Sequence, residues 1–240
     1  MNPLRAVLLD VGGTLWPDAW PPSPDGHYHT RLARALPGLP ASGYERLLVD
    51  MARRNEAEVL RGTTQDTRAL VERTLLEHSL DGGPHVVAAV MEALDLPAEG
   101  LVELFPGARE LLATIEDLGL MGALVSNTTW RGSHGYRRDL NDLGIDGCVD
   151  VVIASLDAGY RKPDERIFGA AVEACGVAPS TCVMVGNSER NDIAPAAALG
   201  MRTIRVAIEE PLPRQSRADA VAPSLYEVED VLRGWCRAEA

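Results

Sequence analysis

The chain has 240 residues, of which 46% are hydrophobic and 24% are charged, and its net charge is −12. These values are typical of an ordinary globular protein with one large core, or with a core and a small second domain. The excess of negative charge argues against nucleic acid or an anionic membrane as the main partner, whereas a phosphorylated small molecule is compatible with it, because a binding site has its own local field.

The first predicted element is a buried strand at residues 6–9, Ala-Val-Leu-Leu, which ends at Asp10. Gly12 and Gly13 allow the backbone to turn sharply and to approach an anion closely, and Thr14 adds a hydroxyl group. A carboxylate at the carboxyl end of a strand lies where ligands bind in open parallel sheets. Taken alone, the segment is more typical of an ordinary exit from a strand.

Residues 17–103 show no further strand of this kind. Residues 17–24 are rich in proline and are predicted to form a loop. Apolar residues three and four apart predict helices at 44–57 and 66–78, and a third helix is predicted at 85–94. The chain is therefore predicted to consist of a core, residues 1–16 and 104–240, with a helical insert at 17–103.

From residue 106 onward strands and helices alternate, as in a parallel α/β sheet. Strands are predicted at residues 120–125, 151–154, 182–185 and 202–206. Helices are predicted at residues 108–118, 139–143, 165–175, 193–199 and 228–237. Asp164 is expected to cap the helix at 165–175 and Gly176 to end it. Residues 211–223 are predicted to be a loop.

Polar segments follow three of these strands. They begin at Ser126-Asn127, include Arg161-Lys162-Pro163-Asp164, and run from Gly186 to Asp192. Right-handed crossovers place the carboxyl ends of parallel strands at one edge of a sheet. We therefore expect four side chains to meet in one crevice, those of Asp10, Ser126, Lys162 and Asp192.

Together, the four polar segments resemble the four sequence motifs of the haloacid dehalogenase-like (HAD) hydrolase superfamily in order and spacing, from about Leu4 to Ile208. The resemblance implies an α/β fold with a Rossmann-like, doubly wound parallel sheet. The insert resembles the small helical cap domain of one subgroup, which closes over the site and excludes water. A helical bundle that serves only stability is the other interpretation of the insert.

The resemblance implies a role for each motif residue. Asp10 would be the nucleophile that forms a covalent intermediate. Ser126 would donate a hydrogen bond to a phosphate oxygen, and Lys162 would supply positive charge near Asp10. Thr14 completes the catalytic set, and the substrate is expected to contact Gly12, Gly13, Asn127, Trp16 and Trp130. A Mg²⁺ ion, which prefers oxygen ligands, would be held by Asp10, Gly12, Asn187 and Asp192.

Ordinary structural roles remain open for several of these residues. Ser126 and Asp192 could cap the helices that follow them. Lys162 could be a solvated surface group. The tryptophans, including Trp20, could serve packing between the insert and the core as well as contact with a substrate.

Two positions depart from the pattern of the family's phosphatases. Gly12 stands where a second Asp usually acts as general acid and base, a role typically worth about 10²–10⁴-fold in rate. Asn187 stands where an Asp usually binds the metal, and its amide oxygen carries no charge, so Mg²⁺ is expected to bind weakly. The candidates for the missing proton donor are Asp18, Asp25 and the segment His27-Tyr28-His29, although a surface position is the ordinary role of a loop histidine.

Three functions are compatible with these departures. The first is a phosphatase for a small phosphorylated metabolite, which acts through an aspartyl-phosphate intermediate on Asp10. The second is hydrolysis of a carbon–halogen bond, which needs neither a proton on the leaving group nor a metal. The third is a catalytically impaired module that binds a ligand or a protein.

The phosphatase is favoured because residues 159–168 and the spacing of residues 187–192 resemble the phosphatase form of the motifs. The family's dehalogenases usually carry an aromatic residue where Gly12 stands, and they receive the halide on an arginine of the cap. Candidates for that arginine are Arg31, Arg34, Arg46 and Arg53.

The four cysteines, at positions 148, 175, 182 and 236, show no close pairing and no zinc-site spacing, which suits a reducing cytoplasm. The apolar run before Asp10 is too short for a signal peptide, and no stretch approaches the length of a membrane span. We expect a cytoplasmic protein, a monomer or a homodimer, without a membrane or nucleic-acid partner.

Overall fold

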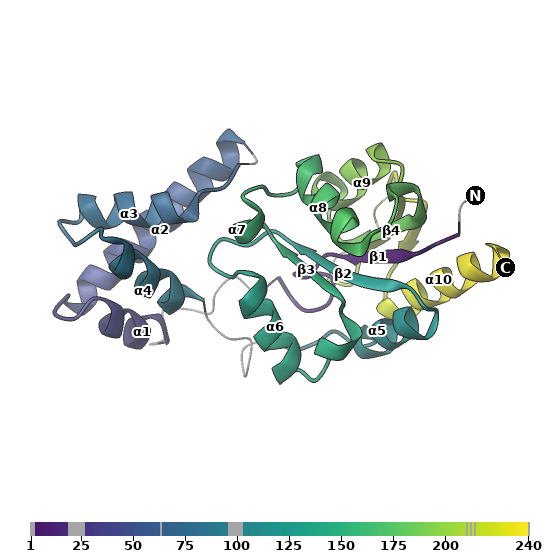
Figure 1. Ribbon diagram of the computed structural model, residues 1–240, viewed down its shortest axis with the longest axis horizontal. Coiled ribbons are helices and arrows are strands. Elements are labelled where there is room, and N and C mark those ends of the chain that lie inside the picture. Colours follow the sequence, from purple (N-terminus) through teal and green to yellow (C-terminus); the bar gives the residue numbers. More distant parts are fainter. Residues whose placement is uncertain are drawn as a thin grey trace.

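The computed structural model describes residues 3–18, 27–62, 64–95, 103–209, 211, 213 and 215–239. Figure 1 shows two units side by side. One, called here the helical unit, comprises the helices of residues 27–95, and the other, the sheet unit, comprises the remaining described residues. Most of the proline-rich segment, with Trp20 and Asp25, lies outside the described residues.

The sheet unit is built on six parallel strands in the order β3-β2-β1-β4-β5-β6 within the described chain. The strands are β1 (Ala6–Leu9), β2 (Met121–Ser126), β3 (Val151–Ala154), β4 (Cys182–Gly186), β5 (Arg202–Val206) and β6 (Ala220–Ala222). The chain leaves β1 toward β2 and β3 and then returns to its other side at β4. Ligands bind at such a switch point in open α/β sheets, outside the carboxyl ends of the strands. The predicted doubly wound α/β fold is thus confirmed.

The register brings the polar segments to one edge. Leu9 lies beside Leu124 of β2 and beside Val185 of β4, so the residues that follow β1, β2 and β4 leave the sheet at the same level. Ser126 in turn pairs with Ala154 at the end of β3.

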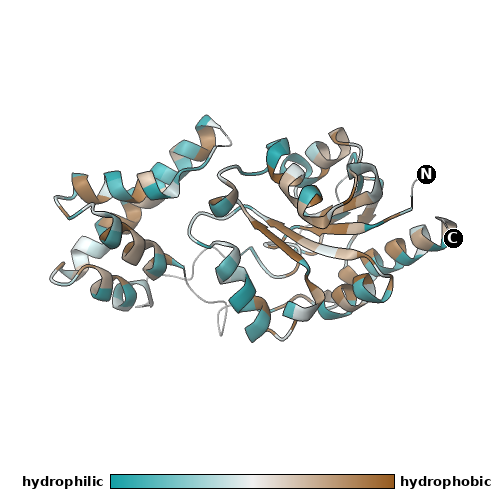
Figure 2. Ribbon diagram, viewed as in Figure 1, coloured by the Kyte–Doolittle hydropathy of each residue, from teal (hydrophilic) through white to brown (hydrophobic). Residues whose placement is uncertain are grey.

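Helices cover both faces of the sheet because β1 alternates between them. Val7 and Leu9 belong to a hydrophobic cluster with one set of helices, and Ala6 and Leu8 belong to the cluster on the other face. The first set is α5 (Ala108–Asp117), α6 (Ser133–Asp142) and α10 (Leu225–Glu239), and the second is α8 (Glu165–Cys175) and α9 (Ala194–Ala198). Apolar residues accordingly predominate along the strands in Figure 2.

The helical unit has a hydrophobic cluster of its own. Its helices are α1 (His27–Ala35), α2 (Ala41–Arg61), α3 (Thr67–Glu77) and α4 (Pro84–Leu94). Leu32, Leu47, Leu70 and Val90 contribute one fully buried side chain from each helix. The helix α1 is not among the predicted elements, since its two buried apolar residues, Tyr28 and Leu32, lie only about one turn apart. The division at residues 17 and 103 stays a prediction, because residues 19–26 and 96–102 are not described.

Several boundaries differ from those expected. The helix α6 begins six residues before the predicted start, at Ser133, and β6 lies within the predicted loop at 211–223. A π-helical turn, η3 (Glu189–Ile193), precedes α9. The Ser188 side chain caps this turn by accepting a hydrogen bond from the backbone N–H of Asn191, so the capping role considered for Asp192 is wrong. Asp164 and Gly176 begin and end α8 as predicted.

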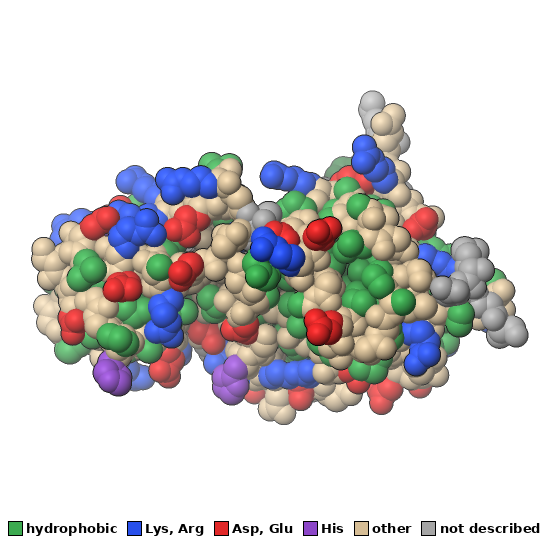
Figure 3. Space-filling view, turned by 45° about the horizontal axis from the view of Figure 1, so that its top comes forward, with side chains coloured by type: hydrophobic (Ala, Val, Ile, Leu, Met, Phe, Trp, Pro, Cys, Tyr) green, Lys and Arg blue, Asp and Glu red, His purple; other side chains and the backbone are tan. Residues whose placement is uncertain are grey.

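Three short helical segments complete the sheet unit: η1 (Asp146–Cys148), α7 (Ser155–Ala158) and η2 (Pro179–Thr181). Among the described residues, no helix is both long and apolar enough to cross a bilayer. Acidic and basic side chains are interspersed over both units on the face shown in Figure 3, so negative charge is not gathered in one patch on this face.

Candidate active site

The loop after β1 folds back on itself at once. The N–H of Gly13 donates to the carbonyl of Trp16 at 2.7 Å, and the N–H of Leu15 donates to that of Val11 at 2.8 Å. Gly13 has φ +72°, and a Cβ there would lie 2.1 Å from Asn187 Nδ2. Only glycine fits this position, because both the backbone conformation and the close approach of the β4 loop exclude a side chain.

At the centre of the site Lys162 lies between two carboxylates. Its Nζ donates to Asp10 Oδ1 at 2.6 Å and to Asp192 Oδ1 at 2.7 Å. The Thr14 hydroxyl donates to Asp10 Oδ2 at 3.3 Å, and the N–H of Ser188 donates to Asp192 Oδ2 at 2.9 Å. The predicted nucleophile is therefore held by hydrogen bonds on both of its oxygens.

Burial and mutual charge shift the pKa values of this cluster. Burial, and then the neighbouring charge of Asp10, raise the pKa of Asp192 to about 6. Burial alone would lower the pKa of Lys162, but the charges of Asp10 and Asp192 outweigh it, so the net shift is upward. The ammonium thus stays charged, and with both carboxylates ionised the cluster carries one net negative charge.

Asn127 holds Lys162 in place through the backbone. Its Nδ2 donates to the carbonyl of Lys162 at 2.9 Å, and its Oδ1 accepts from the N–H of Lys162 at 2.7 Å. Lys162 is the only lysine in the sequence. Its ammonium is a compact charge, so one nitrogen atom donates to both carboxylates.

The side chain of Ser126 contacts a tyrosine that no sequence motif indicates. The Ser126 Oγ lies 2.8 Å from the hydroxyl of Tyr136, which is buried in α6. Burial raises the pKa of Tyr136, so its hydroxyl stays protonated. The Tyr136 ring stacks on Trp16 with centroids 6.2 Å apart. The position of Tyr136 could not be predicted, since it depends on how α6 packs on the sheet.

These side chains surround a cavity of about 110 Å³. Its lining comes from all four predicted segments, with Asp10 and Gly12, Ser126 and Asn127, Lys162, and Asn187 and Asp192. Asp18 also lines it. The cavity is smaller than the roughly 300–1,000 Å³ typical of sites for drug-sized ligands, so it suits a group of a few atoms. The expected convergence of the four segments is confirmed.

Several other predicted contacts are not at this cavity. Trp16 is buried among the residues of the sheet unit, and Trp130 is buried in the cluster of the helical unit. Neither lines the cavity, and their burial fits packing, the alternative interpretation, while contact with a substrate stays a prediction. His29 lies in α1 with its ring 6.1 Å from that of Tyr44, and it does not line the cavity either.

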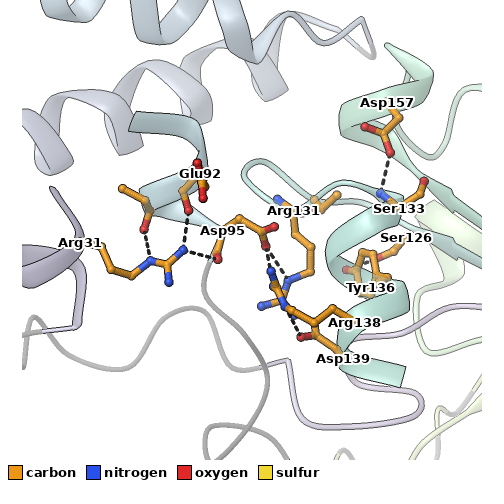
Figure 4. A network of polar contacts seen from close by, with 12 residues as sticks. Arg31, Glu92, Asp95, Ser126, Arg131, Ser133, Tyr136, Arg138, Asp139 and Asp157 are labelled. Carbon is orange, nitrogen blue, oxygen red and sulfur yellow. Dashed lines mark hydrogen bonds and ion pairs between the residues drawn. The ribbon is translucent and has the colours of Figure 1, made fainter. Parts of the chain in front are cut away.

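Among the described residues, polar contacts made by Asp95 and by the segment at Gln65 join the units near the site. In Figure 4 the guanidinium of Arg31 donates to backbone carbonyls at the end of α4, including that of Asp95 at 3.2 Å. The Asp95 carboxylate accepts from Arg131 at 3.3 Å and from Arg138 at 3.4 Å. Arg131 lies over the ring of Tyr136, 5.6 Å from its centroid. Asp95 at the end of α4 is thus linked to Ser126 through Arg131 and Tyr136.

The second set of contacts is made by Gln65 and its neighbour. The N–H of Gln65 donates to the carbonyl of Gly159 at 2.9 Å, and Thr64 forms a backbone bridge with Tyr160. Its Oε1 accepts from Ser155 at 2.9 Å and from Arg161 at 3.0 Å. Its Nε2 donates to the carbonyl of Thr128 at 2.7 Å. Gln65 thereby ties the helical unit to the loops that carry Ser126 and Lys162.

The fit of the site to Mg²⁺ rests on oxygen donors. Among the described residues, no group of three or more His, Cys, Asp and Glu side chains forms a metal cluster. Each carboxylate oxygen of Asp10 and of Asp192 accepts a hydrogen bond, and Asn187 also lines the cavity, so these three side chains are the oxygen ligands that a Mg²⁺ ion could use. Mg²⁺ commonly binds through one or two carboxylates, several waters and a substrate phosphate, so these residues fit a weakly held ion.

Comparison with family models identifies the family of the chain. The model of the haloacid dehalogenase-like hydrolases matches residues 4–200. The chain belongs to this family. It is therefore a HAD-like hydrolase, as the resemblance of its motifs implies.

Phosphatases are among its relatives at low identity. A ribulose-1,5-bisphosphate 5-phosphatase from Halopiger xanaduensis is 27% identical over 207 residues, which cover 83% of each chain. A haloacid dehalogenase-like hydrolase domain-containing protein 3 from Bos taurus is 33% identical over 132 residues, which cover 52% of this chain and 49% of that protein. The match thus spans about half the length of the second relative.

Two solved structures share the fold of this chain but differ from each other in activity. A HAD phosphatase from Thermococcus onnurineus superposes with a TM-score of 0.62 at 23% identity, over 96% of this chain and 99% of the other. A 2-haloacid dehalogenase from Pseudomonas syringae pv. Tomato DC3000 superposes with a TM-score of 0.63 at 20% identity, over 97% and 99%. At these identities the fold is shared, and the choice between the two chemistries depends on the site.

Proposed function

We propose that this HAD-like hydrolase is a phosphatase that acts on a small phosphorylated metabolite through an aspartyl-phosphate intermediate on Asp10. The observation that carries the proposal is the convergence of Asp10, Lys162 and Ser126 on one small cavity. A nucleophile, a fixed cation and a hydroxyl donor are the groups that phosphoryl transfer requires around one phosphorus atom. The relatives that are named phosphatases support the same chemistry.

Each residue has a defined task in this reaction. A carboxylate oxygen of Asp10 attacks phosphorus, the bond to the leaving oxygen breaks, and water then hydrolyses the acyl phosphate to free phosphate. The ammonium of Lys162, 2.6 Å from Asp10, offsets the repulsion between the carboxylate and the incoming anion. Ser126 donates to a phosphoryl oxygen, and Tyr136 orients its hydroxyl from the buried side.

Charge favours a cation in this reaction. The cluster has one net negative charge when both carboxylates are ionised, and a phosphate adds more. Mg²⁺ bound through Asp10 and Asn187 would supply the positive charge that lowers this repulsion. We propose weak binding, because Asn187 contributes no charge.

Dehalogenation fits the geometry less well. That reaction needs a receptor for the halide, and the candidates in the insert do not line the cavity. Arg31 is engaged with backbone carbonyls at the end of α4. Arg34, Arg46 and Arg53 are exposed on the helical unit.

The test is phosphate release from an acyl phosphate and an aryl phosphate, with and without Mg²⁺. The wild-type protein should release phosphate, and Asp10→Asn should reduce release to the background rate. Asp117→Asn is the matched control, because Asp117 is exposed at the end of α5, beside the amino end of β2 and away from the site. Mass spectrometry of the rapidly quenched wild-type enzyme should show one added phosphoryl group on the peptide that contains Asp10.

Three results would overturn the proposal. One is phosphate release that persists in Asp10→Asn. Another is chloride release from a 2-chloro acid that a chelator does not affect, which would indicate the dehalogenase. The third is no turnover of any substrate together with tight binding of a phosphorylated ligand, which would indicate an impaired binding module.

A further inference from the structure

The loop after β1 places Asp18 beside Gly12, the position where the family's phosphatases usually carry a second Asp. The chain reverses between Val11 and Trp16, and Gly12 forms a bridge with Trp16. Asp18, six residues after Gly12 in sequence, therefore lies against Gly12 in space. The spacing alone does not reveal this, because it depends on the tight reversal.

The Asp18 carboxylate lies almost where a side chain on residue 12 would begin. An ideal Cβ on Gly12 would be 2.9 Å from Asp18 Oδ1 and 3.4 Å from its Cγ. Gly12 does not have the positive φ that would exclude a side chain on conformational grounds. The space beside Gly12 is thus occupied by a carboxylate delivered from Asp18.

Asp18 also has the freedom that proton transfer requires. It lines the cavity together with Asp10 and Lys162, and it is exposed at this point. Of the carboxylates among the described residues that line the cavity, Asp10 is the proposed nucleophile and Asp192 is held by Lys162 and Ser188. Within the described chain, no hydrogen bond or ion pair is formed by the Asp18 carboxylate.

We propose that Asp18 supplies, from the far side of the loop, the general acid and base that position 12 lacks; this inference rests on the proposed phosphatase function. As Asp10 attacks phosphorus and the phosphorus–oxygen bond breaks, the Asp18 carboxyl group gives its proton to the leaving oxygen. The Asp18 carboxylate then takes a proton from the water whose oxygen attacks the acyl phosphate. Free phosphate leaves, and Asp10 and Asp18 return to their starting states.

With this role for Asp18, the loss of its carboxyl group should lower kcat/KM by an amount that depends on the leaving group of the substrate. An acyl or nitrophenyl phosphate expels a stable anion that needs little protonation, whereas an alkyl phosphate must expel an alcohol. In Asp18→Asn, kcat/KM for an alkyl phosphate should fall about 10²–10⁴-fold. For an acyl or nitrophenyl phosphate the fall should be less than about tenfold.

A second, more specific test moves the carboxylate from residue 18 to residue 12. Asp18→Ala removes the carboxylate and clears the space beside Gly12, and Gly12→Asp then places a carboxylate on the other side of the same space. The double variant Gly12→Asp/Asp18→Ala should recover alkyl phosphatase activity at least about tenfold over Asp18→Ala. Gly12→Asp alone should gain little, because Asp18 already fills the position. Asp117→Asn serves as the control for loss of one carboxylate.

The outcomes separate this inference from the proposed function. If the wild type releases no phosphate from either class of ester, both fail. If the wild type is active and Asp18→Asn lowers both classes equally, or neither, only the role of Asp18 is overturned. An increased Mg²⁺ requirement for both classes would assign Asp18 to metal binding and would also overturn it. Circular dichroism on each variant checks that it is folded.

Discussion

At the scale of single residues, the site depends on one buried cation between two buried carboxylates. Lys162 is 3% exposed and Asp192 is fully buried. Removing one partner from a buried ion pair leaves uncompensated charge and is strongly destabilising. The arrangement that we propose prepares Asp10 for attack is therefore also one whose disruption would destabilise the protein.

Replacing this cation gives a first prediction. Lys162→Met keeps the length of the side chain but leaves Asp10 and Asp192 facing each other without an ammonium. The free energy of unfolding should fall by about 3–5 kcal/mol at pH 7.5 and by clearly less at pH 5, where a carboxylate takes up a proton. Urea unfolding at both values measures this. An equal loss at the two values would mean that lost packing, and not charge, explains the effect.

The raised pKa of Asp192 gives a second prediction, on stability. Its pKa moves from 3.8 in the unfolded reference to about 6 in the folded protein, so the folded state holds this proton more tightly. The contribution is complete below about pH 4 and is lost as the pH rises through about 6. Between pH 4 and pH 7.5 the wild type should therefore lose about 1–3 kcal/mol relative to Asp192→Asn.

Urea unfolding of both proteins across this range gives the difference between their free energies, in which the other titrating groups largely cancel. If the free energies of unfolding of the two proteins changed in parallel with pH, Asp192 would not titrate in this pH range.

The sequence predicts some of these residues and not others for a physical reason. Asp10, Ser126 and Lys162 each follow a buried strand, and the register of a parallel sheet brings such positions together. Tyr136 and Gln65 reach the site only through helix packing and contact between the units. Neither leaves a periodic pattern in the chain.

At the scale of elements, long amphipathic helices and buried strands were predictable because burial imposes their periods. The short irregular segments were not. The π-helical turn η3 brings Asp192 back against the end of β4, where its carboxyl carbon would lie 2.6 Å from a Cβ on Gly186. This close approach depends on the absence of a side chain at Gly186, which no spacing rule requires.

Adding that side chain gives a third prediction. Gly186→Ala should push Asp192 away from Lys162, lower phosphate release strongly and cost about 1–3 kcal/mol of stability. Gly169→Ala is the matched control, because Gly169 lies within α8 and an added Cβ there meets nothing within 4 Å. The control should be neutral or slightly more stable, since alanine favours a helix over glycine. Full activity in Gly186→Ala would contradict the tight packing of η3 on β4.

At the scale of the whole molecule, two units are joined near the site by polar contacts and by Trp130 of the sheet unit, which is buried in the hydrophobic cluster of the helical unit. Gln65, between α2 and α3, and Asp95, at the end of α4, make the polar contacts. Polar contacts between units resist separation less than a shared apolar core, so relative motion is the expected behaviour. A closing helical unit would exclude bulk water from the site while Asp10 attacks phosphorus, the task that we propose for it.

The final prediction tests whether these two contacts hold the units together. Gln65→Ala removes the acceptor of the buried Arg161 guanidinium, which should cost about 1–3 kcal/mol. Asp95→Ala removes the partner of Arg131 and Arg138. Small-angle scattering should show a larger radius of gyration for the double variant than for the wild type.

Glu77→Ala is the control, because it breaks an ion pair with Arg54 that lies wholly within the helical unit. Its radius of gyration should match that of the wild type, whatever its effect on stability. If the double variant were as compact as this control, the side chains of Gln65 and Asp95 would not hold the units together. The apolar packing of Trp130 in the helical unit and the backbone contacts of residues 64–65 with residues 159–160 would then fix their arrangement.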